Sequence, residues 1–60
     1  MTALDRDDRQ KIRDLGDAIA EDRGWEALGE NLRQLLADHD LPCTARAEQE
    51  LRDHLIWLLS

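Results

Sequence analysis

The sequence predicts an all-α protein, a small three-helix bundle with helices at about residues 5–22, 25–38 and 45–59. Leucine supplies most of the large apolar side chains, while Val, Phe and Tyr, which favour strands, are absent. Apolar residues also recur at helical spacings of three and four along three segments. Because a chain of 60 residues is too short for two cores, we expect residues 1–60 to form a single helical domain.

The first segment carries its apolar side chains on one helical stripe. The stripe consists of Ile12, Leu15, Ala18 and Ile19, and Leu4 extends it towards the amino-terminal end. The charged residues of this segment lie mostly on the remaining surface. Thr2 or Asp5 is the expected N-cap, because hydroxyl and carboxylate oxygens accept hydrogen bonds from the unpaired N–H groups of a first turn.

The second and third segments each show their own stripe. That of the second consists of Trp25, Leu28, Leu32, Leu35 and Leu36. The stretch "DHDLPCT" then ends the helix, because Pro42 cannot continue it and aspartate favours turns. Thr44 is the expected N-cap of the third helix. The apolar face of this helix consists of Ala47, Leu51, Leu55, Leu58 and Leu59.

The break between the first two helices depends on periodicity, because "EDRGWE" contains one Gly and no Pro. The apolar stripe is displaced by one residue after this stretch, which rotates the helix face by about 100°. A turn at Arg23-Gly24 accommodates this shift. In such a hairpin Gly16 and Gly29 would lie at similar heights and permit a close approach of the helices, unless both are merely tolerated surface glycines. The alternative is one long helix from Asp5 to Asp38, folded against the short last helix and completed by a second chain into an intermolecular bundle.

The last seven residues, "HLIWLLS", contain five consecutive large apolar residues. On a helical wheel of about 100° per residue, Leu51 and Leu58 lie close to Leu55, whereas Ile56 and Trp57 point elsewhere. One helix of a monomeric three-helix bundle cannot bury two opposed faces. We therefore expect Ile56 and Trp57 to form an interface with another chain, against the simpler alternative of a solvent-exposed tryptophan.

The charge balance limits the partners. Fourteen acidic residues against eight basic ones give a formal net charge of −6, which disfavours nucleic acid and anionic membrane surfaces and favours a basic partner. No apolar run is long enough for a membrane span. The lone cysteine, Cys43, cannot form an internal disulfide, and residues 1–9 are too charged for a secretion signal, so a cytoplasmic location is expected.

Potential metal ligands gather in one turn, at Asp38, His39, Asp40 and Cys43. Their spacing matches no strong zinc motif, and these residue types are ordinary in turns, so we predict no metal site and no cofactor. No nucleophile, base and orienting group follow a recognisable order, and no glycine-rich phosphate loop is present. The sequence therefore predicts that the protein is not an enzyme.

Two functional hypotheses follow. The segment "GWEALGENL" resembles the Trp-and-Leu pattern of death-like helical adaptor domains, over nine residues only, and assigns no family. The first hypothesis is a small acidic protein-protein interaction module, adaptor-like or inhibitor-like, which self-associates through its C-terminal helix or binds a protein with a basic or apolar surface. The alternative is a small dimeric nucleic-acid-binding regulator that aligns Arg6, Arg9 and Arg13 of the first helix.

Overall fold

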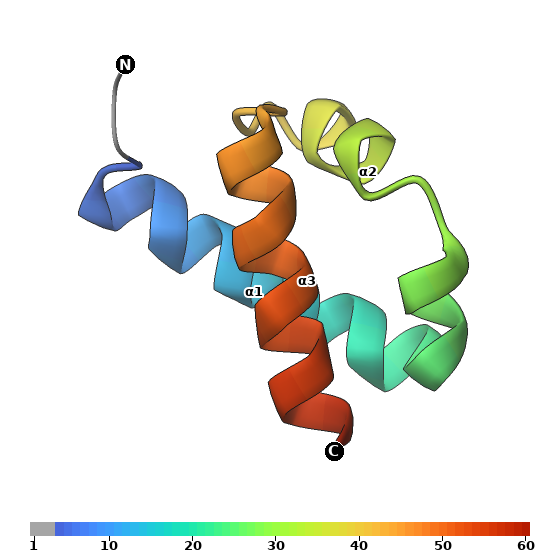
Figure 1. The fold of residues 1–60 in the computed structure, drawn as a ribbon. Coiled ribbons are helices and arrows are strands. Elements are labelled where there is room, and N and C mark those ends of the chain that lie inside the picture. Colours follow the sequence, from blue (N-terminus) through green and yellow to red (C-terminus); the bar gives the residue numbers. More distant parts are fainter. Residues whose placement is uncertain (1–3) are drawn as a thin grey trace.

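The computed structural model describes residues 4–60, which form a small all-α bundle without strands (Figure 1). The described chain contains three α-helices and one 3₁₀ helix, in the order α1 (Arg6–Arg23), η1 (Gly24–Gly29), α2 (Leu32–Asp38) and α3 (Ala45–Leu59). The predicted fold class, a three-helix bundle, is confirmed. None of these helices is long and apolar enough to cross a bilayer.

Helix α1 begins after Asp5, as one of the two expected caps predicts. The Asp5 carboxylate accepts a hydrogen bond of 2.8 Å from the backbone N–H of Asp8. Asp7 and Asp8 lie in the first turn, where the helix dipole favours negative charge. Thr2, the other expected cap, lies outside the described residues.

The chain turns at Gly24, at the place that the shift in periodicity predicts. Gly24 has a φ of 61°, which a residue without a side chain adopts easily, and its N–H donates to the Ala20 carbonyl. The alternative of one long helix from Asp5 to Asp38 is therefore wrong, because α1 ends at Arg23.

The expected second helix, residues 25–38, is not continuous. Its first part is the 3₁₀ helix η1, and α2 begins only at Leu32. Glu30 and Asn31 separate the two, and the side-chain oxygen of Asn31 accepts a hydrogen bond of 3.2 Å from the N–H of Gln34. The physical reason is that an asparagine side chain competes with helical backbone hydrogen bonds in mid-helix and caps a new helix instead.

Trp25 does not belong to the core, contrary to the sequence prediction. Its side chain is 58% exposed, while Ala27 of η1 is fully buried. A 3₁₀ helix has three residues per turn, so the stripe extrapolated at 3.6 residues per turn misses the buried face of η1. Leu28 still packs partly against the core.

Helix α3 has the predicted bounds and the predicted cap. The Thr44 hydroxyl accepts a hydrogen bond of 3.2 Å from the N–H of Ala47. On the predicted face, Ala47, Leu51 and Leu55 are fully buried, and Leu58 and Leu59 are half-buried. This face packs mainly on α1, which α3 crosses (Figure 1).

The buried apolar residues form one cluster to which every helix contributes. It consists of Ile12, Leu15, Ile19, Ala27, Leu32, Leu36, Leu41, Ala47, Leu51 and Leu55. Ala18, expected on the core stripe, is exposed, because it lies about 110° around α1 from the centre of the buried face. Leu41, in the loop before α3, is buried although no periodicity predicted it.

Of the two glycines at which a close approach was expected, only Gly16 shows one. A Cβ on Gly16 would lie 2.8 Å from Cδ2 of His54 and 3.3 Å from Cδ1 of Leu51, both on α3. A Cβ on Gly29 would have no atom within 4 Å. The close approach predicted at Gly16 therefore exists, but it joins α1 to α3, because the second segment bends away at η1 and α2.

Candidate interaction surface

Helix α3 exposes the two apolar residues that the wheel places off its core face. Trp57 is 73% exposed and Ile56 is 44% exposed. Because they are consecutive, their side chains leave the helix about 100° apart. The expectation that neither residue is needed for the internal core agrees with this exposure.

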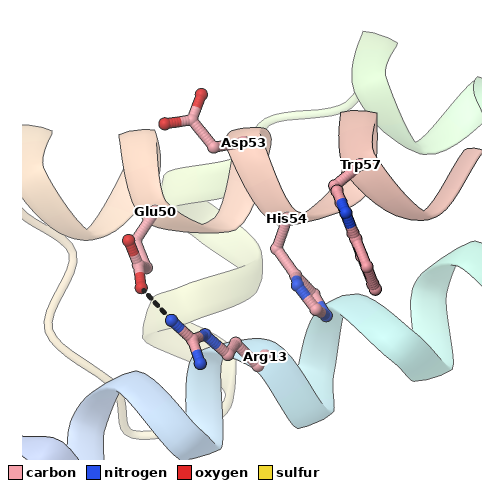
Figure 2. A pocket seen from close by; sticks show the side chains of 5 residues that line it. All are labelled: Arg13, Glu50, Asp53, His54 and Trp57. Carbon is pink, nitrogen blue, oxygen red and sulfur yellow. Dashed lines mark ion pairs between the residues drawn. The ribbon is translucent and has the colours of Figure 1, made fainter. Parts of the chain in front are cut away.

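Although Trp57 is exposed, one face of its ring contacts another side chain of α3. Its ring stacks on that of His54, with centroids 5.9 Å apart and planes 19° apart. Figure 2 shows both rings extending from α3 towards α1. The indole therefore has one partner within its own chain and offers the rest of its surface to solvent.

The imidazole of His54 links α3 to α1. Its Nε2–H donates a hydrogen bond of 2.9 Å to Oδ1 of Asp17. The side chain of His54 is only 16% exposed, and its ring lies where a side chain on residue 16 would otherwise be. Gly16, Asp17 and Trp57 together determine the position of this ring.

An open hollow of about 410 Å³ lies beside these rings (Figure 2). It is lined by Arg13, Glu50, Asp53, His54 and Trp57. Within it, the Arg13 guanidinium lies 3.5 Å from the Glu50 carboxylate. Asp53 points away from this pair and accepts a hydrogen bond of 2.7 Å from the Gln49 amide. The hollow has a polar rim and an exposed aromatic ring, an arrangement suited to contact with another macromolecule.

A second hollow, of about 330 Å³, lies between α1 and the loop that precedes α3. It is lined by Lys11, Asp14, Leu15, Ala18, His39 and Leu41. Leu15 and Leu41 are the buried members of this set, and Ala18 is exposed. Sequence periodicity missed this hollow, because it assigned Ala18 to the core and did not predict that Leu41 packs against α1.

The possible metal ligands of the 38–43 turn have other roles. Asp38 accepts a hydrogen bond of 2.9 Å from the Gln34 amide, and Nδ1–H of His39 donates one of 2.9 Å to the Leu35 carbonyl. Asp40 has a φ of 58° and shapes the turn, and Cys43 is exposed. Within residues 4–60, no three His, Cys, Asp or Glu side chains are placed to hold a metal ion.

Two arginines of α1 are paired with carboxylates. Arg13 contacts Glu50. Arg23 contacts both carboxylate oxygens of Glu30 at 2.6 Å and one oxygen of Asp22 at 3.2 Å. The pKa of Arg23 is raised, mainly by its hydrogen bonds to Glu30 and to a smaller extent by the one to Asp22. Neither side chain adds an uncompensated positive charge, whereas Arg6 and Arg9, the other two arginines of the nucleic-acid alternative, are exposed on α1.

Sequence reasoning missed the contact between Asp17 and His54. These residues are 37 positions apart, and helical periodicity describes one helix at a time. The available signal was Gly16 next to Asp17, since a glycine inside an amphipathic helix indicates a close approach by another element.

Comparison of the chain with protein families, with curated proteins and with solved structures gives no match.

Proposed function

We propose that this protein is a small acidic protein-protein interaction module that self-associates through Ile56 and Trp57 of α3. The exposure of Trp57 is the observation that carries the proposal. The core of the bundle is complete without this indole, and tryptophan is strongly enriched among residues that dominate binding energy in interfaces.

The stacking of Trp57 on His54 supports the same proposal. A side chain that is already restrained loses little conformational entropy on binding, and this entropy is one of the main costs of association. His54 is restrained in turn by its hydrogen bond to Asp17. The ring is thus partly preorganised for contact with another chain.

A different protein is the other possible partner within this proposal. The net charge of −6 favours a basic surface on it, and the exposed apolar side chains favour an apolar patch. The role is then that of an adaptor or an inhibitor. A cytoplasmic location, expected from the lone cysteine, also belongs to the proposal.

The test compares an exposed and a buried apolar residue of α3, Trp57 and Leu55. Trp57→Ser is expected to lower the mass in solution and to leave the helical circular dichroism largely intact. Leu55→Ser is expected to remove both association and helicity, because Leu55 is fully buried. Light scattering after size-exclusion chromatography gives the mass of each variant.

Trp25→Ser is the matched control, because Trp25 is also an exposed tryptophan but lies on η1. We expect it to keep the wild-type mass. If Trp25→Ser lowers the mass as much as Trp57→Ser does, association depends on general surface hydrophobicity and not on α3. If neither variant changes the mass of an associating wild type, α3 does not form the interface.

A further inference from the structure

The hollow on α1 has the size and lining expected of a small apolar acceptor site. Its volume of about 330 Å³ lies at the low end of ligand pockets, which range over roughly 300–1,000 Å³. Leu15, Ala18 and Leu41 supply its apolar lining, and Lys11, Asp14 and His39 supply polar groups. Such a site accommodates one inserted side chain better than an extended ligand.

The α1 hollow and Trp57 of the same chain lie beside different faces of α1. Trp57 shares its own hollow with Arg13, and Arg13 lies about 130° around α1 from the centre of the group formed by Lys11, Asp14 and Ala18. Asp17, which holds His54, also lies on the Arg13 side. An exposed indole and an apolar hollow are thus present on different faces of one molecule.

The charges beside the two features are complementary. Asp53 and Arg52 are exposed on α3, within about one helical turn of Ile56 and Trp57. Lys11 and Asp14 line the hollow on α1. Arg13 and Glu50, which also border Trp57, pair with each other. Asp53 can therefore face Lys11 of a second copy while Arg52 faces Asp14.

We propose that Trp57 of one copy inserts into the α1 hollow of a second copy, with Ile56 covering its edge. This inference rests on the proposed self-association and specifies how it occurs. The contact is heterologous, because the two copies contribute different surfaces. Each bound copy then keeps one unused indole or one unused hollow, so association continues beyond a dimer into rings or open chains.

The expected association is weak. An aromatic side chain buries about 150–250 Å². A stable interface commonly buries about 800 Å² on each partner. One inserted indole with a small surrounding contact falls below that area, so association is expected at micromolar or higher concentrations.

A mixing experiment tests the heterologous contact. Trp57→Ala removes the inserted side chain, and Ala18→Arg blocks the hollow at an exposed position of α1. Each variant alone is expected to be monomeric. An equimolar mixture is expected to form a 1:1 dimer and nothing larger, because the intact Trp57 of one variant enters the intact hollow of the other. Sedimentation equilibrium measures both.

Matched controls use equivalent surface positions. Trp25→Ala removes another exposed tryptophan, and Ala37→Arg adds an arginine at an exposed alanine of α2. Both are expected to associate as the wild type does. Circular dichroism checks folding, and Asp14→Arg is a second hollow-blocking variant to use if Ala18→Arg loses helicity.

The outcomes separate this inference from the proposed function. A 1:1 dimer in the mixture supports the heterologous contact. If the wild type associates but the mixture stays monomeric, the inference is wrong, while self-association through one shared α3 surface stands. If the hollow-blocking variants associate as the wild type does, the inference is also wrong. A wild type that is monomeric at every concentration overturns this inference and the proposed self-association, and leaves a different protein as the partner of α3.

Discussion

Residue 16 determines how closely α1 and α3 approach each other. Because Gly16 has no side chain, the imidazole of His54 lies directly over α1, within hydrogen-bonding distance of Asp17. That imidazole in turn carries the stacked ring of Trp57. A missing side chain on one helix thus sets the position of the most exposed aromatic ring on another.

The first prediction concerns this approach. Gly16→Leu is expected to lower the free energy of unfolding by about 1–3 kcal/mol, because the new side chain overpacks the contact with His54 and Leu51. Chemical denaturation followed by circular dichroism measures the change. Gly29→Leu is the control and is expected to stay within about 0.5 kcal/mol of the wild type, since no atom lies within 4 Å of its Cβ position. Equal losses in both variants would contradict the role of Gly16.

Each α-helix begins at a polar side chain that accepts a hydrogen bond from a backbone N–H three residues later. The caps are Asp5, Asn31 and Thr44. Helix α2, Leu32–Asp38, is the shortest and would be marginal in isolation, because isolated helices shorter than about 12–15 residues are unstable in water. Its stability therefore depends on burying Leu32 and Leu36.

The second prediction follows from this dependence. Leu32 is 1% exposed, so Leu32→Ala is expected to cost about 2–5 kcal/mol through lost burial and a cavity. Leu35→Ala, in the same helix, is expected to cost clearly less, because Leu35 is only half-buried. Thermal and denaturant unfolding measure both. A loss below about 0.5 kcal/mol for Leu32→Ala would mean that α2 packs through another face.

The sequence predicted well those features that neighbouring residues determine. The caps Asp5 and Thr44, the bounds of α3 and the turn at Gly24 all follow from local patterns. The features it missed depend on distant parts of the chain. The 3₁₀ winding that exposes Trp25 is one, and the burial of Leu41 is another.

The features of the candidate site likewise divide into those that the local sequence pattern predicts and those that depend on distant parts of the chain. The exposure of Ile56 and Trp57 follows from their positions on the wheel, because Leu51 and Leu55 already define the buried face. The hydrogen bond between His54 and Asp17 depends on how two helices cross, which the pattern of either helix alone does not specify. The hollow on α1 likewise requires the loop containing Leu41 to return to that helix.

At the scale of the whole molecule, a complete small core coexists with exposed apolar side chains. The fully buried large side chains are Ile12, Leu32, Leu36, Leu51 and Leu55. Domains of this size are marginally stable, with roughly 0.05–0.15 kcal/mol per residue, and small cores are often supplemented by association. Self-association through α3 would add buried apolar area and would stabilise the folded chain by mass action.

The central claim is that α3 presents an interface to a second copy of the chain. Sedimentation equilibrium of the wild type, from about 1 μM to about 1 mM, tests it most directly. The account predicts a weight-average mass that rises with concentration above the 6.9 kDa of one chain. A mass that stays at 6.9 kDa over the whole range would contradict it.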